Sequence, residues 1–463
     1  MDGPTAPAPV EPDDDAQYLK AIASCGDKRP LVVSQPIYTA AGIKLLDTGA
    51  KVDSRILDRL FGHKLAEPID RCVASEDVVR AKDLVARARE LVAAAPLLAH
   101  FEAGLEAQSS RLWSAFTACP LPPAIAMRLT VARDTASTVY EHSLRATFLA
   151  LFIGTRARFS QGDLQMLATA ALLHDIGMMH ADPTLYDDEK PLDMAGRRNL
   201  HAHPVTGQLI AQRERSLSPV IATAIAQHHE RLDGTGYPRG LAGEAISKFA
   251  RILMLVEVAL AMLERHREQP ELRLSLLLRL NHRSFDTKLS EIVLAALPRL
   301  ALKEGDTPAN GPEHEQVASL IDAWPKLRAS MPPAADEPPA AFIEARIARL
   351  RRWLADAGLG DPEAAALAAS DEPMVCAEIA ALAREALWHA RQIAYEALHR
   401  WPELALTVGA AASSAAGEWI AMGLREQAST GCDVDPLEAG SSSGCRSGAS
   451  ALSSETASAL VNR

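Results

Sequence analysis

Cysteines and aromatic residues are scarce in this chain of 463 residues, and long apolar runs are missing. No two cysteines form a C-x-x-C pair, so we expect a reduced, cytoplasmic protein rather than a disulfide framework. No apolar run reaches the ~18 residues that cross a bilayer. The N-terminal stretch also lacks the basic and apolar regions of a signal peptide. The six cysteines are Cys25, Cys72, Cys119, Cys376, Cys432 and Cys445.

Net positive charge is missing as well. The formal net charge is -11, which argues against a general DNA binder because phosphate backbones need clustered Lys and Arg. The hydrophobic content of 48%, rich in Ala and Leu with 5% aromatics, is enough to bury cores and favours helix. The sequence therefore predicts a mainly α fold.

Prolines, glycines and polar stretches interrupt the helical and strand patterns and so divide the chain into several predicted segments. Short strands are expected at 31–33, 37–38 and 43–46, followed by a helix from Ser54 that Asp53 caps. Later helices are expected at 124–155, after the N-cap Ser160, and from Pro219. We expect a flexible lead-in (1–28), a small α+β module (29–70), connecting helices (71–123), a main domain (124–310), a Pro-rich linker (311–340), a C-terminal helical domain (341–428) with Trp353, Trp388, Trp401 and Trp419 as core anchors, and a disordered tail (429–463).

Imidazoles and carboxylates recur in the main domain at the ends of apolar runs. A single histidine on an apolar helix is usually a packing or surface residue, but burying so many titratable groups without a metal or pairing would be costly. We therefore predict a binuclear metal centre in which the Asp175 carboxylate bridges two ions. The candidate ligands are His142, His174, Asp175, His203, His228, His229 and Glu257.

Such a centre suits phosphodiester hydrolysis, because divalent ions lower the pKa of water and neutralise charge on phosphate oxygens. Mixed His and carboxylate ligands suit Fe or Mn at least as well as Zn, and no thiolate lies near them in the sequence to favour Zn.

The motifs in this domain resemble the HD-GYP family, a branch of the HD phosphohydrolases that hydrolyses cyclic di-GMP in bacteria. The resemblance covers residues 132–298. The motifs that carry it are His142-Ser143-Leu144-Arg145-Ala146, Leu173-His174-Asp175-Ile176-Gly177, His203-Pro204-Val205-Thr206-Gly207, the run from His228-His229-Glu230 through Gly236-Tyr237-Pro238 to Leu241, Arg251-Ile252 and Phe285-Asp286. The N-terminal module also resembles one found ahead of some HD-GYP domains.

The resemblance implies an HD-type helical bundle that holds two or three metal ions and takes cyclic di-GMP, with signalling proteins as partners of the N- and C-terminal modules. His174 and Asp175 would be catalytic as well as metal-binding. The expected substrate-binding residues are Arg231, Asp233, Gly236, Tyr237, Pro238 and Arg239, of which the two arginines have an equally good interpretation as surface charges.

Four positions depart from the family's pattern. Met178 stands where a Lys usually follows, and methionine offers neither charge nor a donor to a phosphate. Glu257 replaces the usual ligand Asp, and Leu260 replaces a second Asp. Thr138 occupies the position of a third-metal Glu, which favours two ions.

Three functions remain open on the sequence. The retained ligand positions favour a cyclic di-GMP phosphodiesterase that releases pGpG or GMP. The substitutions at 178, 257 and 260 favour a degenerate module that senses cyclic di-GMP or binds proteins. An HD phosphohydrolase for another nucleotide is a weaker alternative, because the Gly-Tyr-Pro turn argues against it.

Overall fold

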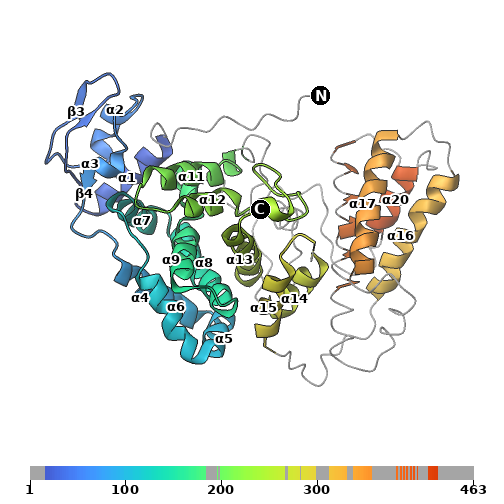
Figure 1. Cartoon of the computed structure of the whole chain (residues 1–463). Coiled ribbons are helices and arrows are strands. Elements are labelled where there is room, and N and C mark those ends of the chain that lie inside the picture. The colour runs from blue at the N-terminus through green and yellow to red at the C-terminus, as the bar shows by residue number, and fades with distance from the viewer. Residues whose placement is uncertain are drawn as a thin grey trace, which may run out of the picture. The chain divides into compact units, whose positions relative to one another are not determined.

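The computed structural model describes residues 16–183, 196, 199–265, 270–281, 283–298, 312–330, 337–356 and 415–425, together with 382–383, 386–387, 389–391, 393–394, 397–398, 400–401 and 404. The chain forms two compact units (Figure 1). The first consists of Met1–Glu271 with His282–Pro298, and the second includes Leu272–Asn281 and the residues from 299 to 454.

A small α+β module (residues 16–74, the N-terminal module) opens the first unit. Three of its strands lie where the sequence predicts them, and a fourth pairs with the first, so the module extends beyond residue 70. Asp53 caps the short helical turn after it as expected, by accepting from the Arg55 amide. The elements are α1 (Ala16–Lys28), β1 (Val32–Val33), β2 (Ile37–Tyr38), β3 (Lys44–Leu46), η1 (Ser54–Ile56), α2 (Leu57–Leu60), α3 (Ile69–Cys72) and β4 (Val73–Ala74), with β1 antiparallel to β4 and β2 antiparallel to β3.

The helix α1 corrects the prediction of a flexible lead-in over residues 1–28, of which the structure describes the part from residue 16. Tyr18, Leu19, Ile22 and Cys25 recur at helical spacing and are all buried. They give α1 an apolar face that packs against α7 (Pro123–Thr135). The prolines and acidic residues before position 16 obscured this pattern.

A bundle of helices follows the module. The predicted single helix over 124–155 is wrong in one respect, because Ala136 leaves helical geometry and separates α7 from α8 (Ser137–Arg156). Just before the break the Thr135 hydroxyl donates to the Val131 carbonyl, a contact that bends helices. The elements before and after the break are α4 (Ala81–Ala94), α5 (Pro96–Leu105), η2 (Glu106–Gln108), α6 (Ser109–Thr117), α9 (Gln161–Leu173), η3 (Ile176–His180), α11 (His203–Arg213), α12 (Pro219–Gln227), η5 (Gly243–Ala245), α13 (Lys248–Arg265) and α15 (Thr287–Ala296).

Helix α8 lies at the centre of this bundle and contacts α4, α6, α7, α9 and α13 (Figure 1). Its Leu144, Phe148 and Phe152 are fully buried. The predicted helix starts are confirmed, since the Ser160 hydroxyl accepts from the Asp163 amide as the N-cap of α9 and Pro219 is the first residue of α12. The bundle brings the ends of α9, α11 and α12 next to α8 and α13.

The second unit is helical, as predicted for the C-terminal domain. Part of the predicted linker is in fact helix α16 (Pro312–Ser330), because Val317, Leu320, Ile321 and Trp324 form a buried stripe against α20 (Ala415–Arg425). Trp419 on α20 is fully buried and its indole N–H donates to the Leu320 carbonyl at 2.8 Å. Helices α14 (Pro270–Leu280) and α17 (Glu337–Asp356) complete the described helices of this unit. The side chains of Trp353 and Trp388 and the predicted tail lie outside the described residues, and Trp401 is partly buried.

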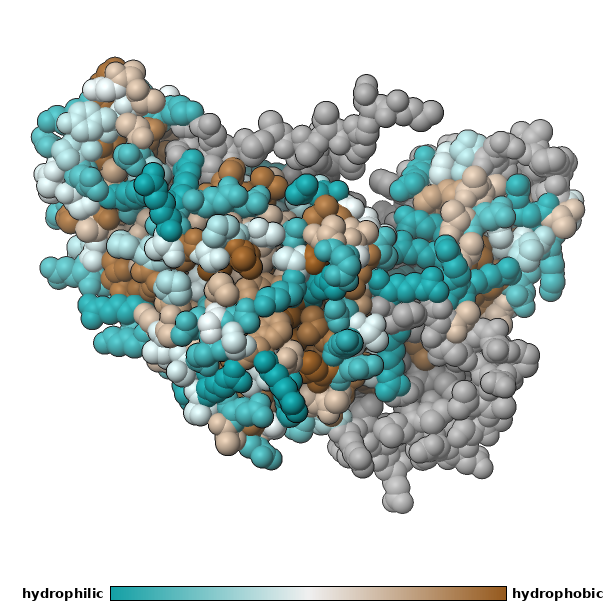
Figure 2. Space-filling view, viewed as in Figure 1, coloured by the Kyte–Doolittle hydropathy of each residue, from teal (hydrophilic) through white to brown (hydrophobic). Residues whose placement is uncertain are grey.

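The visible surface mixes hydrophilic and apolar side chains (Figure 2). Ile43 and Tyr38 of the N-terminal module are among the exposed large apolar residues, 62% and 41% exposed. Within the described part of the chain, no helix combines the length and apolar character that a membrane crossing requires.

Candidate metal centre

The predicted His-Asp pair lies where α9 ends. His174 is the C-cap residue of α9 and is fully buried, and Asp175 directly precedes the turn η3. The His174 Nδ1 lies 2.7 Å from the Ala171 carbonyl oxygen. A carbonyl only accepts, so Nδ1 carries a proton and Nε2 is the nitrogen left to bind a metal.

Two further histidines are held in the same way. His203 starts α11, and its Nδ1 contacts the Leu200 carbonyl at 2.6 Å. His228 ends α12, and its Nδ1 contacts the Ile225 carbonyl at 2.6 Å. A backbone carbonyl three residues earlier therefore sets the tautomer and ring orientation of all three imidazoles, as outer-shell partners do for metal-binding histidines.

All seven predicted ligands come together in two groups that share one carboxylate. Within each group the ligand atoms lie within 4.8 Å of one another. Asp175 Oδ2 faces the first group, 3.4 Å from His174 Nε2, and Asp175 Oδ1 faces the second, 3.2 Å from His203 Nε2. The first group is His142, His174, Asp175 and Glu257, and the second group is Asp175, His203, His228 and His229.

Glycines let the elements approach closely enough to form the second group. A Cβ atom on Gly177, in η3, would lie 2.1 Å from the His203 carbonyl oxygen and 2.8 Å from the Gly207 amide nitrogen. A Cβ on Gly207 would lie 2.9 Å from Ile225. The two glycines therefore allow α11 to lie against the turn that follows Asp175.

The charges of the first group reinforce one another. Burial alone lowers the pKa of His174, but the carboxylates of Asp175 and Glu257 outweigh it and raise that pKa to about 10. His142 Nε2 lies 3.0 Å from Glu257 Oε1. Burial lowers the pKa of His142 too, yet Glu257 and Glu264 raise it well above its ordinary value. Glu257 itself has a pKa well below the ordinary value, because His142 and His174 outweigh its burial.

The second group behaves differently. Burial is the main reason that the pKa of His228 is lowered, and the pKa of His229 is lowered further by burial and by His228 and His203 nearby. These imidazoles are therefore neutral near pH 7, the form that binds metals. The pKa of Asp175 lies well below its ordinary value, because the surrounding histidines outweigh its burial.

The donor set fits divalent cations. His203 Nε2 and His228 Nε2 face each other at 3.2 Å, and both Nδ1 protons are already used by carbonyls. Two lone pairs that face each other in a buried site repel unless a cation lies between or beside them. His229 Nδ1 is buried and has no hydrogen-bond partner among the described residues. Nitrogen and oxygen donors without a thiolate suit Fe, Mn or Zn.

The Gly-Tyr-Pro turn folds back over the second group. The Tyr237 ring stacks on His229, with ring centroids 4.7 Å apart, and on His201, 4.0 Å apart. The Tyr237–Pro238 peptide bond is cis. A Cβ on Gly236 would lie 2.4 Å from the Arg231 amide nitrogen, so glycine permits this close return of the chain.

Buried contacts hold the same turn in place. Glu230 is fully buried and accepts from the amides of Arg239 and Leu241 at 2.9 and 2.8 Å. Asp233 accepts from the Thr235 amide and from the Ser284 hydroxyl at 3.0 and 2.7 Å. These contacts connect Asp233 both to the turn and to Ser284, which precedes α15.

The two arginines that were candidates for phosphate contact lie in different environments. Arg231 is 2% exposed, donates to the Glu230 carbonyl and lies over the Phe285 ring. Arg239 is exposed at the end of the turn. Of these two arginines, Arg239 is therefore the one whose guanidinium is accessible to a ligand from solvent.

The positions that depart from the family's pattern lie close to the centre or inside the bundle. Met178 and Leu260 are buried, and Thr138 is exposed. Sequence reasoning missed Glu264, whose Oε2 lies 3.5 Å from His142 Nδ1 and which also contacts Arg145. Its spacing of seven residues from Glu257 places both carboxylates on one face of α13, and this signal was available in the sequence.

The fold and the clustered ligands are those of an HD domain, and residues 127–275 match the family model described as HD domain. This match shows that the chain contains an HD domain over these residues.

Several relatives share this part of the chain. The 3′3′-cGAMP-specific phosphodiesterase 3 of Vibrio cholerae is 37% identical over 119 residues, which are 25% of each protein. A cyclic di-GMP phosphodiesterase of Pseudomonas aeruginosa is 34% identical over 120 residues, 26% of this chain and 29% of that protein. The chain thus matches about a quarter of the length of these relatives. The solved structure of Bd1817, an HDG"Y"P protein from Bdellovibrio bacteriovorus, is 16% identical with a TM-score of 0.34 over 57% of this chain and 95% of that one.

Proposed function

We propose that this protein is a metal-dependent phosphodiesterase that hydrolyses cyclic di-GMP to pGpG or GMP. The observation that carries the proposal is the shared carboxylate: Asp175 directs one oxygen to His174 and the other to His203, 3.4 and 3.2 Å away. One carboxylate between two ligand groups suits a pair of ions at the spacing used in phosphodiester hydrolysis. The relatives named as cyclic-dinucleotide phosphodiesterases support the reaction class.

The ligand groups would hold two divalent ions, for which Fe or Mn is our first choice. When bound, these ions supply a nucleophilic water near neutral pH and neutralise charge on the phosphate. The residues of the chain keep that arrangement rigid. Carbonyls of Ala171, Leu200 and Ile225 orient the imidazoles. The Asp175 carboxylate connects the two ligand groups.

The Gly-Tyr-Pro turn would define one wall of the substrate pocket. Its stacking on His229 and its anchoring by Glu230 place the turn directly beside the second group. We assign Gly236, Tyr237 and Pro238 to shaping this wall and Arg239, whose side chain is exposed, to a phosphate of the substrate. Arg231 and Asp233 would act by holding the turn, since both make contacts within it.

A second function is favoured by one residue. Met178 is buried in the turn after Asp175, where it offers no charge to a phosphate. A module with an intact ligand set but without this contact would bind a cyclic dinucleotide and act as a sensor or a platform for protein partners. Binding measured by calorimetry without turnover would support this alternative.

The experiment uses the full chain loaded with Fe or Mn and follows cyclic di-GMP and 3′3′-cGAMP by chromatography. We expect hydrolysis of cyclic di-GMP that chelation abolishes and metal restores. The double variant His174→Ala with Asp175→Ala should be inactive, whereas His100→Ala, an exposed histidine on α5, should match the wild type. The proposal would be refuted if the double variant kept its turnover, or if the wild type showed no turnover at any metal loading. Faster turnover of 3′3′-cGAMP would correct the substrate alone.

A further inference from the structure

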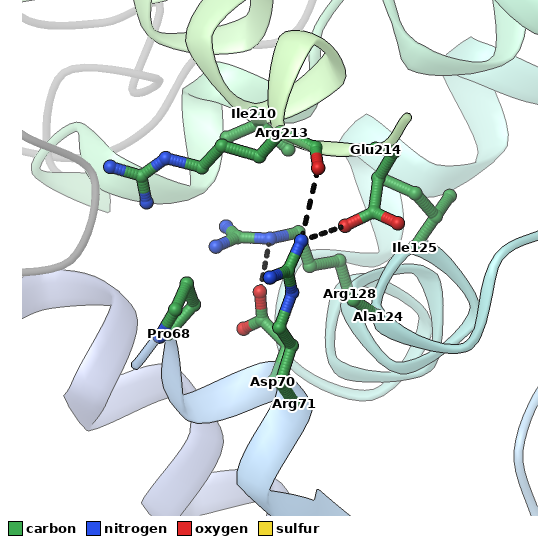
Figure 3. A pocket seen from close by; sticks show the side chains of 9 residues that line it. All are labelled: Pro68, Asp70, Arg71, Ala124, Ile125, Arg128, Ile210, Arg213 and Glu214. Carbon is green, nitrogen blue, oxygen red and sulfur yellow. Dashed lines mark hydrogen bonds and ion pairs between the residues drawn. The ribbon is translucent and has the colours of Figure 1, made fainter. Parts of the chain in front are cut away.

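A buried charged cluster lies away from the metal centre, where the N-terminal module meets the HD domain. At its heart is Arg128 of α7, which is 3% exposed. Its Nε lies 2.6 Å from an oxygen of Asp70, on α3 and also buried (Figure 3). Its guanidinium carbon lies 4.3 Å from the centre of the Tyr18 ring of α1. One guanidinium therefore joins two elements of the N-terminal module to α7.

The same guanidinium reaches the turn that follows the His-Asp pair. Arg128 Nη1 lies 2.9 Å from His180 Nε2, which accepts because a guanidinium can only donate. The His180 ring also stacks on the Tyr18 ring, with centroids 5.0 Å apart. His180 is the last residue of η3, and η3 begins directly after Asp175. Contacts from Asp175 to Met178 and from Met178 to Ala181 keep this turn tight, at 2.8 and 2.9 Å.

Helix α3 touches the second element of the centre as well. Arg71 Nη2 donates to the Arg213 carbonyl at 3.0 Å and pairs with Glu214 at 3.1 Å, at the end of α11 (Figure 3). Helix α11 begins with the ligand His203. The four residues of α3 are thus connected to two of the elements beside the second ligand group. Arg128 connects them to η3, which follows Asp175, and Arg71 connects them to α11, which begins with His203.

Stability alone gives little reason for such a cluster. Replacing a buried ion pair by well-packed apolar residues is often neutral or stabilising, because desolvation of the charges cancels much of their attraction. Satisfied buried polar networks instead specify one arrangement of the elements that they join. The element specified here is η3, which has Asp175 immediately before it.

We propose that Arg128 and His180 are positioning residues that hold η3, and through it Asp175, where both ligand groups need the carboxylate. Asp70 makes this placement depend on the docked N-terminal module. The module is then part of the metal centre's support, and a partner or signal that displaces α3 would weaken metal binding. The inference rests on the metal centre of the proposed function, but not on its substrate.

Titration of the metal-free full chain with Mn²⁺ tests this proposal. Calorimetry and electron paramagnetic resonance would follow binding well below the unfolding temperature, beside thermal unfolding of the same samples. Arg128→Met should weaken Mn²⁺ affinity about 10- to 100-fold, the range found when outer-shell partners of metal ligands are lost. It should also destabilise the fold, because Asp70 is left buried without its partner.

The double variant Asp70→Asn with Arg128→Met separates positioning from stability. Removing both charges should restore much of the thermal stability. The hydrogen bond from Arg128 to His180 is still missing, so we expect Mn²⁺ affinity to stay 10- to 100-fold below the wild type. A purely structural role would instead restore the affinity together with the stability.

Arg29→Gln is the matched control. Arg29 pairs with Asp134 of α7 and with Asp77 at the same junction, and its described ion pairs do not involve η3. We expect this variant to bind Mn²⁺ as the wild type does. Wild-type affinity in the double variant, or an equal loss in Arg29→Gln, would overturn the inference.

These outcomes are distinct from those of the proposed function. A wild-type chain that binds Mn²⁺ but hydrolyses no cyclic dinucleotide refutes the function and leaves the Mn²⁺ comparison decisive. Hydrolysis together with full affinity in the double variant refutes the positioning role alone. A chain that binds no divalent ion refutes both.

Discussion

The two ligand groups that share Asp175 differ in charge. The first group pairs two imidazoles with two carboxylates, while the second has three imidazoles and the shared Asp175 as its one carboxylate. As a result the histidines of the metal-free first group hold protons, whereas His228 and His229 of the second group are neutral rings. The difference teaches that one centre contains two sites of different hardness, and that their loading with metal should respond differently to pH.

Asp175→Ala should have the largest effect, because it removes the carboxylate that both groups share. We expect the metal content of the purified chain to fall from two ions toward none. Turnover should fall by at least about 1,000-fold, since several kcal/mol of charge stabilisation are lost. Elemental analysis and a hydrolysis assay measure both. Asp163→Ala, in the first turn of α9 and paired with Lys248, is the control. One ion retained at full occupancy would show that the groups do not depend on a shared ligand.

The pH dependence of metal binding should distinguish the two groups. Carboxylates raise the pKa of His174 to about 10, so a metal ion must displace a proton there at neutral pH. Affinity of the first group should therefore rise with pH, about 100-fold from pH 6 to pH 8 for one displaced proton. Burial lowers the pKa of His228, so the second group should change little over the same interval.

Calorimetry in buffers of different ionisation enthalpy gives the number of protons released with each ion. Proton release with the ion of the first group and none with the ion of the second group is the expected result. Equal release in both steps would remove the contrast between the groups.

Met178→Lys should change the rate without changing either group's affinity for metal. A lysine at this position would donate a charged hydrogen bond to the substrate phosphate, which methionine cannot do. It should therefore raise turnover up to about 100-fold. Steady-state kinetics and elemental analysis measure the two effects. Met179→Lys is the matched control, since Met179 is the adjacent residue and equally buried. A changed metal content in Met178→Lys would mean that the residue acts through the ligands.

Glu264→Gln should have the smallest effect and should be confined to the first group. Its carboxylate oxygen Oε2 lies 3.5 Å from His142 Nδ1. In His174, by contrast, a backbone carbonyl contacts Nδ1. We expect about a tenfold loss of affinity for the ion of the first group. Glu141→Gln is the control, because Glu141 also pairs with Arg145. Mn²⁺ titration of both variants decides, and equal losses would assign the effect to Arg145 rather than to His142.

Helix and strand positions were predictable where a local pattern set them. The short strands, the Asp53 and Ser160 caps and the start of α12 at Pro219 all follow from residues within one or two turns. The break at Ala136 and the helix α1 were missed. The first depends on a side-chain contact to the backbone, and the second was obscured by the polar residues before it.

The sequence by itself determined which side chains are available to the centre. Histidines and carboxylates at the ends of apolar runs, with Asp175 next to His174, were sufficient to predict seven side chains that the structure brings together. The residue types also determined the likeness to HD-GYP domains, because the Gly-Tyr-Pro stretch is specific.

Only the tertiary structure decided how those side chains face one another. The two oxygens of Asp175 point to different groups because α9 and α12 end where α11 begins, and Gly177 and Gly207 let these elements approach one another. The cluster of Arg128 joins residues 52 and 58 positions away in the chain. No local pattern encodes such contacts, since they form only when distant helices pack and bury the charges together.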